Sequence, residues 1–535
     1  MDDIAVSDPV SGAPVRNIAD LVRRAARRNG DGRALIFRDS VLSWSELDSK
    51  VDQVAARLRG LSIGAGERIA IALPNGLDFP IAYLGALRAD LVVLPVNPGY
   101  TRRELAHVLA DSGAVAVVAG GGVLAEVEAV RSELPVLAHV FTADKLVSGP
   151  VTPGEPVRSE RGGEDLALLI YTSGTSGRPK GAMLSHRAVL ANFEQCAKIQ
   201  PRVLNPDDVV LLVLPLFHVY GLNPGLGQVL WEGCTAVLAE RFDPVSTLGL
   251  IARHQITNVP GAPPMYVAWS LLPDFAEVFA GVRVAICGAD QLPADTQRRL
   301  RDATGRYVFE GYGLTETAPV LTSTLMSDKP KIGSIGRPIP GVEVRLIDVA
   351  SGEDVGDRAG QAGDDDDDDD DVHATADPGE IMVRGANLFS GYWPDGQDGP
   401  DAEGWWKTGD VAYADEDGDL FLVDRIKEMI LVSGFNVYPR EVEDVLVAHP
   451  GIVEAAVIGA PHPYTGETVK AYVVTAPGVQ LSAEDVIAHC ERGLARFKCP
   501  ATVEFVTALP HSATGKVSKG RLRLAARRGL DPSGI

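Results

Sequence analysis

The sequence predicts an α/β protein with three parts: a large N-terminal domain with parallel-rich sheets flanked by helices, a β-rich subdomain, and a small α+β domain at the C-terminus. Three observations lead to this prediction. Apolar strands and amphipathic helices alternate strictly from residue 67 to 118, which is typical of a parallel sheet with helices on both faces. The chain becomes β-rich after Gly341, and a mixed order of helices and strands follows Pro439.

The N-terminal elements follow from periodicity and capping signals. Residues 17–29 place apolar side chains on one helical face, and Ser43 with Glu46 forms a capping box that opens a second helix. Further strands are expected at 67–73, 91–96, 114–118, 209–215, 282–287 and 307–310, and further helices at 77–89, 101–110 and 186–197. A second capping box, which begins at Thr101, opens the helix at 101–110.

The C-terminal third of the chain is predicted to contain more strands and fewer helices than the N-terminal part. Strands are expected at 342–347 and 380–384, and a hairpin over 411–423 turns at Asp415–Gly418. Beyond it the sequence predicts helices at 439–448 and 482–493, and strands at 452–458, 469–474 and 502–505.

Composition narrows the class of partner. The 535 residues carry a formal net charge of −22, so a nucleic-acid surface or an anionic lipid surface is not expected as the main partner. Eight consecutive aspartates, Asp364–Asp371, repel one another, and we expect residues 352–378 to form an acidic disordered loop. Ca²⁺ binding there is the alternative, but the run lacks the spaced ligands and the glycine of a calcium loop.

The five cysteines are scattered, odd in number and lack metal-ligand spacing, so a reduced, cytoplasmic protein is expected. No signal peptide is evident at the N-terminus, and the richest apolar run, 209–217, is far too short to span a membrane. Peripheral membrane association and the oligomeric state stay open.

One glycine-rich stretch, Tyr171–Gly181, points to a bound polyanion. Glycines and small hydroxyl residues favour a loop with accessible backbone N–H groups, and Lys180 adds a positive charge. The stretch is not a P-loop, because Pro179 and Gly181 stand where that motif needs a glycine and a hydroxyl residue. A plain glycine/serine linker is the alternative.

Further candidate residues follow predicted strands. His218 lies beyond the apolar run 209–215, at the edge where open α/β sheets place ligands, although a histidine among aromatics can equally be a core residue. Gly288 and Ala289 follow the strand 282–287. The motif Gly311–Glu316 follows the strand 307–310 and offers an aromatic ring, a hydroxyl and a carboxylate. The glycines on either side of Tyr312 are expected to leave a face of its ring open to a flat partner.

Three later motifs complete the set: Trp406–Asp410, Asp424–Pro439 and Ala513–Lys516. Each also has a plain reading as a surface acid or a solvated base. After Lys516, the residues Lys519, Arg521 and Arg523 look like ordinary solvated basic residues.

Together these motifs closely resemble, over nearly the whole chain and in the same order, those of the acyl-adenylate-forming superfamily. The resemblance implies an N-terminal adenylation domain, 1–424, and a mobile C-terminal lid, 425–535, with its hinge near Lys427. It implies catalytic roles for Lys516, Glu316, Thr172 and His218, with Glu316 on Mg²⁺ and His218 lining the acyl pocket. Three largely apolar segments, 217–223, 258–265 and 288–292, are expected to line that pocket. The residues it implies for the nucleotide and coenzyme A are Thr172, Ser173, Gly174, Thr175, Ser176, Gly177, Lys180, Gly288, Ala289, Gly311, Tyr312, Gly313, Thr315, Asp410, Arg425, Lys427, Gly434 and Lys516. Among them, Asp410 and Arg425 are implied for the ribose, and Gly434 is expected beside the path of the pantetheine arm.

The implied activity is that of an acid–thiol ligase. A carboxylic acid, expected to be a medium- or long-chain fatty acid, reacts with ATP to give acyl-AMP and pyrophosphate, and the acyl group then passes to coenzyme A. The sequence leaves four alternatives open: an aryl-CoA ligase of the coumarate or benzoate type, an acyl-AMP ligase that loads a carrier protein, a luciferase-like monooxygenase, and a non-catalytic AMP-binding sensor.

Overall fold

The computed structural model describes residues 14–61, 63–148, 156–172, 179–349, 351–355, 378–425, 428–432, 435–462, 466–511 and 516–528. The chain divides into two compact units. The first unit comprises Met1–Glu343 and Arg384–Trp406, and the second comprises Val344–Val383 and Lys407–Ile535. The predicted loop at 352–378 lies almost entirely outside the described residues, and the predicted 424/425 boundary and hinge stay predictions.

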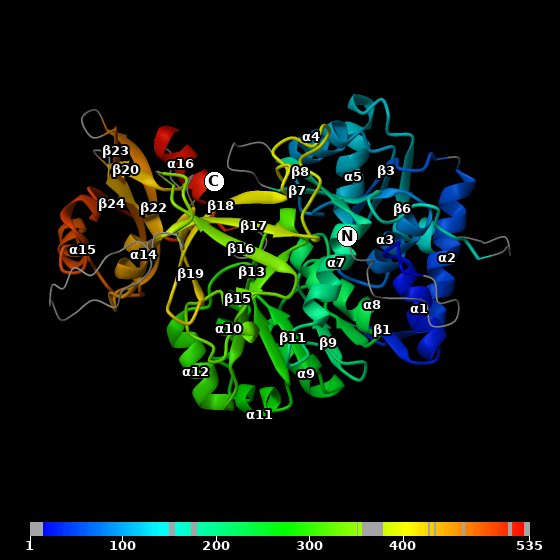
Figure 1. Cartoon of the computed structure of the whole chain (residues 1–535), viewed down its shortest axis with the longest axis horizontal. Helices are drawn as coiled ribbons and strands as arrows, with labels where there is room; N and C mark the ends of the chain where they lie inside the picture. The colour runs from blue at the N-terminus through cyan, green and yellow to red at the C-terminus, as the bar shows by residue number, and fades with distance from the viewer. Residues whose placement is uncertain are drawn as a thin grey trace. The chain divides into compact units, whose positions relative to one another are not determined.

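A six-stranded sheet in the first unit has the order β6-β5-β3-β4-β7-β8. Four of its strands, β3, β6, β7 and β8, are labelled in Figure 1. All its neighbours are parallel except the edge hairpin β7–β8. The strands are β3 (Arg68–Ala72), β4 (Val92–Pro95), β5 (Ala116–Ala119), β6 (His139–Thr142), β7 (Leu166–Thr172) and β8 (Lys180–Ser185).

A nine-stranded sheet in the same unit has the order β15-β14-β13-β12-β11-β9-β10-β1-β2. Five of its strands, β1, β9, β11, β13 and β15, are labelled in Figure 1. Its centre, from β13 to β1, is parallel, and antiparallel strands close both edges. The strands are β1 (Arg33–Phe37), β2 (Ser40–Ser43), β9 (Val209–Leu212), β10 (Thr235–Leu238), β11 (Asn258–Gly261), β12 (Val284–Cys287), β13 (Val308–Gly313), β14 (Val320–Ser323) and β15 (Arg337–Pro338).

Helices pack against both sheets of the first unit and complete their hydrophobic cores. Both predicted capping boxes form: Ser43 caps α2 and Thr101 caps α4, each with a glutamate three residues on. One helix, α7, contacts β7 and β8 of the smaller sheet and also the segment η2 beside β9. The helices are α1 (Asp20–Asn29), α2 (Trp44–Gly60), α3 (Asp78–Arg88), α4 (Arg102–Ser112), α5 (Gly121–Val130), α6 (Ala143–Val147), α7 (His186–Ala197), α8 (Gln228–Glu232), α9 (Pro244–His254), α10 (Pro263–Trp269), α11 (Phe275–Phe279) and α12 (Ala294–Thr304), with the π-helix η2 (Gly221–Gly227).

Two smaller sheets lie mostly in the second unit. One has the order β16-β17-β18-β19, formed by β16 (Val342–Ile347), β17 (Gly379–Gly385), β18 (Trp405–Ala414) and β19 (Leu420–Arg425). The other is built on the long antiparallel pair of β22 (Ile452–His462) and β23 (Gly466–Thr475). Its further elements are β20 (Ile430–Val432), β21 (Phe435–Val437), β24 (Thr502–Phe505), α14 (Pro439–Val447), α15 (Ala483–Cys490) and α16 (Lys519–Arg528).

The observed elements confirm the α/β prediction, and most predicted bounds are met within two or three residues. The strand expected at 209–215 is shorter, since β9 ends at Leu212. All five cysteines are buried free thiols. Within the described parts of the chain, no helix combines the length and the apolar character that crossing a bilayer requires.

Candidate active site

The hairpin β7–β8 carries the two ends of the predicted phosphate loop. Thr172, the last residue of β7, is the register partner of Lys180, the first residue of β8. The antiparallel pairing holds the two backbones side by side, so the Thr172 hydroxyl and the Lys180 ammonium group start from adjacent backbone positions. The predicted loop residues Ser173, Gly174, Thr175, Ser176 and Gly177 lie outside the described residues.

Lys180 is held by two groups from one distant segment. Its Nζ lies 2.9 Å from Oδ2 of Asp398 and 4.9 Å from the ring centroid of Tyr392. The Lys180 and Asp398 side chains are 48% and 64% exposed, so water screens their ion pair. The pair therefore orients the lysine more than it stabilises the fold.

Tyr392 links this lysine to the predicted metal residue. Its hydroxyl donates a hydrogen bond to Oε1 of Glu316 across 2.6 Å, and Glu316 is buried, with 6% exposure. The Tyr392 segment is fixed on both sides: Tyr392 bridges Ala182 of β8, and Phe389 N–H donates to the Glu316 carbonyl. Asp398, Lys180, Tyr392 and Glu316 thus form one continuous polar chain across the first unit.

The Gly311–Glu316 motif continues β13 into the short 3₁₀ helix η3 (Thr315–Thr317). Tyr312 pairs with Thr322 of β14 and is half-buried. A Cβ on Gly313 would lie 1.8 Å from the carbonyl oxygen of Pro319, so only glycine fits there. Gly311 meets nothing closer than 3.4 Å. Close packing against Pro319 therefore explains why residue 313 is a glycine. The sequence had suggested a different reason, that this glycine leaves the Tyr312 ring accessible.

Three segments predicted to line an acyl pocket meet around Tyr220. Its hydroxyl donates to the carbonyl oxygen of Gly261 at 3.2 Å, and a Cβ on Gly288 would come within 2.9 Å of its ring. Gly288 N–H also donates to the Gly261 carbonyl. The next residue, Ala289, has φ 71°, a region that non-glycine residues rarely adopt and that clusters at functional sites.

His218 lies just before this cluster and is partly buried. Its Nδ1 accepts a hydrogen bond from the Tyr220 N–H at 3.2 Å, which places the ring hydrogen of the neutral form on Nε2. Burial lowers the pKa of His218 to about 4. At neutral pH the side chain is therefore an uncharged hydrogen-bond donor.

The predicted ribose-binding residues are neighbours in the second unit. Asp410 of β18 and Arg425 of β19 are register partners, and the Asp410 side chain is buried. The Asp410 N–H donates to the Thr408 hydroxyl at 3.1 Å, which fixes the backbone before the carboxylate. The predicted hinge residue Lys427 and the predicted pantetheine-path residue Gly434 lie outside the described residues.

Lys516, the last residue of the predicted motif 513–516, is exposed. Val517, the next residue, forms an antiparallel bridge with His511. The prediction that Lys519 is an ordinary solvated base is wrong: its side chain is 13% exposed and forms ion pairs with Glu428 and Glu443. Sequence could not reveal this, because the two carboxylates come from other elements.

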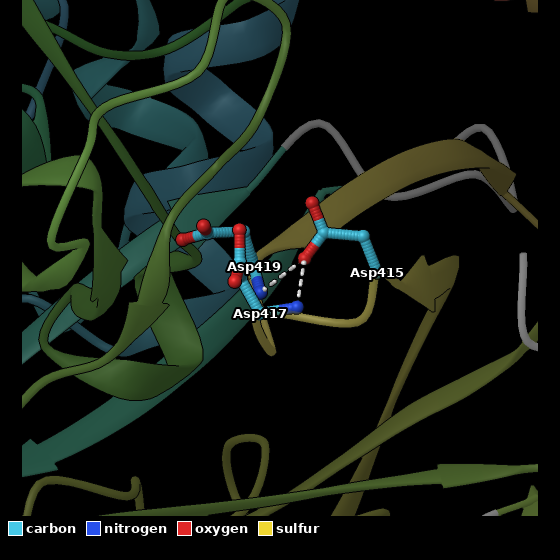
Figure 2. A group of neighbouring side chains, drawn as sticks. All are labelled: Asp415, Asp417 and Asp419. Carbon is cyan, nitrogen blue, oxygen red and sulfur yellow. Dashed lines mark hydrogen bonds between the residues drawn. The ribbon is translucent and has the colours of Figure 1, made fainter.

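A group of three aspartates turns the β18–β19 hairpin (Figure 2). One carboxylate oxygen of each lies within 4.8 Å of the others, a spacing that a cation could bridge. The geometry has a simpler cause: Oδ1 of Asp415 accepts the backbone N–H groups of Asp417 and Asp419 at 3.1 and 3.0 Å. This is the ordinary role of an aspartate at a tight turn.

Sequence reasoning also missed Tyr392 and Asp398. Both lie in the glycine-rich segment 391–399, whose aromatics and turn residues were the only signal available. A tyrosine and an acid in a loop indicate a functional position only weakly until their partners are known.

The described geometry is an α/β fold in which the hairpin β7–β8 is linked through Tyr392 to the buried carboxylate of Glu316, and a second compact unit holds most of the C-terminal part of the chain. Family comparison agrees: residues 22–393 match the AMP-binding enzyme family, and residues 441–516 match the AMP-binding enzyme C-terminal domain. The chain belongs to the AMP-binding enzyme family.

Its relatives include a long-chain-fatty-acid–CoA ligase of Yersinia pestis, 34% identical over 95% of this chain and 94% of that protein. A feruloyl-CoA synthase of an Amycolatopsis species is also 34% identical, over 94% of this chain and 97% of that protein. Among solved structures, ATP-bound MatB from Rhodopseudomonas palustris is similar with a TM-score of 0.84 and 32% identity, covering 95% of this chain and 99% of that one.

Proposed function

We propose that this protein activates a medium- or long-chain fatty acid with ATP, releases pyrophosphate, and transfers the acyl group from acyl-AMP to coenzyme A. The observation that carries the proposal is the polar chain from Lys180 through Tyr392 to Glu316, which lies at the base of the phosphate loop. The similarity to long-chain-fatty-acid–CoA ligases over almost the whole chain supports the same choice.

The first unit holds the triphosphate in this proposal. Residues 172 to 177 supply hydroxyl and N–H donors, and Lys180 supplies the charge that opposes the β- and γ-phosphates. Glu316 provides a buried carboxylate oxygen, which is the donor type that Mg²⁺ takes together with phosphate oxygens. When bound, Mg²⁺ would neutralise charge on the phosphates.

The nucleoside has its own contacts. The half-buried ring of Tyr312, between Gly311 and Gly313, offers a face to adenine, and Thr315 begins the turn that carries Glu316. Asp410 is suited to accept hydrogen bonds from both ribose hydroxyls, with its register partner Arg425 beside it.

Chemistry in the first step is positioning and charge neutralisation. A carboxylate oxygen of the fatty acid attacks the α-phosphorus, the bond from that phosphorus to the bridging oxygen breaks, and pyrophosphate leaves. We assign Lys516 to the α-phosphate and the incoming carboxylate, where its positive charge opposes the negative charge of both reactants.

In the second step the sulfur of coenzyme A attacks the acyl carbon, AMP leaves, and the thiol proton passes to solvent. The neutral Nε2–H of His218 and the cluster around Tyr220, Gly261 and Gly288 line the proposed acyl side. Largely apolar segments there suit an alkyl chain. We place the reaction in the cytoplasm, which the buried free thiols support.

The test follows pyrophosphate and thioester separately with ATP, Mg²⁺, coenzyme A and a panel of fatty and aryl acids. We expect both products with medium- or long-chain fatty acids, and loss of pyrophosphate release in Lys516→Ala. Adenylate without thioester would contradict the coenzyme A assignment. Preference for feruloyl-type acids would favour an aryl-CoA ligase, and no pyrophosphate with any acid would favour a nucleotide sensor.

A further inference from the structure

The lysine at the start of α16 lies in an unusual environment. Nζ of Lys519 is 2.9 Å from Oε1 of Glu443 and 3.3 Å from Oε2 of Glu428, and all three side chains are less than one-fifth exposed. Burial by itself lowers the pKa of Lys519. The negative charges of Glu443, Glu428 and Asp424 raise it by more, so the pKa lies above its ordinary value. The side chain is charged at neutral pH.

This position is unfavourable for a lysine by itself. A buried ammonium loses its hydration, and the first residue of a helix lies at the positive end of the helix dipole. The surrounding carboxylates must offset both effects. An apolar side chain would fill the same space equally well. The buried charge therefore indicates that this residue must be held in one particular position.

Two of the carboxylates, those of Glu443 and Asp424, also accept backbone hydrogen bonds from neighbouring elements. Oε1 of Glu443, on α14, also accepts the Val457 N–H of β22 at 2.6 Å. Asp424 of β19 accepts the Arg440 N–H at the start of α14 at 2.8 Å. Glu428 is the first described residue after Lys427. The lysine therefore connects the start of α16 with α14, with β22 and with the segment between β19 and β20.

Lys516 is separated from this anchor by only two residues, and both are held. Val517 bridges His511, and Ser518 N–H donates to the Pro510 carbonyl at 2.7 Å. Beyond the anchor, Leu522 and Ala525 are fully buried. Among the described residues around Lys516, the chain on its C-terminal side has little freedom to shift while Lys519 stays in place.

We propose that Lys519 is a positioning residue for Lys516: its ion pairs with Glu428 and Glu443 fix the start of α16, and so fix the point from which the Lys516 side chain reaches its substrates. The inference rests on the adenylation role proposed for Lys516. It adds that this role depends on a buried cation that contacts neither ATP nor the acid.

The test compares Lys519→Met, which keeps length but removes the charge, with Lys519→Arg, which keeps the charge. Two half-reactions are measured: pyrophosphate release from ATP and fatty acid, and thioester formation from supplied synthetic acyl-AMP and coenzyme A. For Lys519→Met we expect a 10- to 100-fold fall in kcat of the first, a KM for ATP within about threefold of wild type, and a second half-reaction within about twofold. Lys519→Arg is expected to recover most of the loss, and exposed Arg521→Met, the matched control, to match wild type.

A double-mutant comparison shows whether the effect passes through Lys516. In a Lys516→Ala background, Lys519→Met should cause less than a twofold further loss of pyrophosphate release. A full additional loss, or equal loss of both half-reactions, would overturn the positioning role. If Lys519→Met does not fold, Glu428→Gln, which removes one of the two partners, decides by the same readouts. A wild-type protein that releases no pyrophosphate with any acid would instead refute the proposed function.

Discussion

Tyr392 and Glu316 lie far apart in the sequence, yet the Tyr392 hydroxyl donates a 2.6 Å hydrogen bond to a carboxylate oxygen of Glu316. The bond satisfies a buried acceptor and fixes the direction of the remaining carboxylate oxygen. Because the same tyrosine ring lies beneath Lys180, one residue aligns both the predicted metal ligand and the predicted phosphate lysine.

Tyr392→Phe removes only the hydroxyl and keeps the ring beneath Lys180. Hydrogen bonds to charged groups contribute about 1.5–3 kcal/mol, so we expect kcat/KM for pyrophosphate release to fall about 10- to 100-fold. Pyrophosphate release measured against Mg²⁺ concentration checks this, with Asp398→Asn as the control that leaves Glu316 untouched. An unchanged Mg²⁺ dependence and rate would contradict the alignment role.

Gly313→Ala is expected to destabilise the first unit, because the new Cβ would lie 1.8 Å from the Pro319 carbonyl oxygen and the backbone must move. Overpacking of this kind costs about 1–3 kcal/mol or more. Gly311→Ala, two residues earlier in the same strand, is the matched control, since its nearest atom is 3.4 Å away. Thermal unfolding of both variants measures the difference; equal midpoints would refute the packing explanation.

His218 should stay neutral well below physiological pH. Burial lowers its pKa to about 4 from an ordinary 6.5, so protonation of this residue should not reduce activity as the pH falls from 8 to about 5. NMR titration of the imidazole, together with kcat/KM for the fatty acid, checks the expectation. An imidazole that titrates near pH 6.5 in the folded protein would show that the ring is hydrated.

We expect the free energy of unfolding to fall at acid pH because of His186. Its Nδ1 accepts the Ile18 N–H at 3.2 Å, and burial, aided by Arg161, lowers its pKa to about 3. A group whose pKa is lower in the folded state contributes stability that is complete above pH 6.5 and is lost as the pH falls through about 3. The full loss is on the order of 5 kcal/mol.

Unfolding of the wild type and of His186→Gln between pH 7 and pH 3.5 tests this contribution. The glutamine variant should be less stable at pH 7 but should lose less stability on acidification. Partly exposed His139→Gln serves as the control. Parallel pH curves for wild type and His186→Gln would show that the buried ring does not govern the acid limb.

The sequence was sufficient where local chemistry decides the structure. Capping boxes at Ser43 and Thr101, apolar strands and the turn at Asp415 all appear as predicted, because each depends on residues within a few positions. The partnership of Thr172 with Lys180 was not predicted, because no strand was expected between the loop and the helix at 186–197.

Contacts between distant segments were not foreseeable. The Lys180–Tyr392–Glu316 chain joins three segments that only the folded chain brings together. Lys519 shows the same limit, because a basic run at the start of an amphipathic helix has the composition of a solvated surface. Whether such a lysine is buried depends on where α14 places Glu443.

The burial of the five thiols matters for the proposed chemistry. A mixed anhydride acylates any thiolate within reach, and reactivity depends on the fraction of thiol that is ionised. Burial raises the pKa of Cys196 to about 12 and of Cys490 to about 11, and raises those of Cys234, Cys287 and Cys499 as well. The five cysteine thiols are therefore both enclosed and protonated, so none of them competes with coenzyme A for the acyl group.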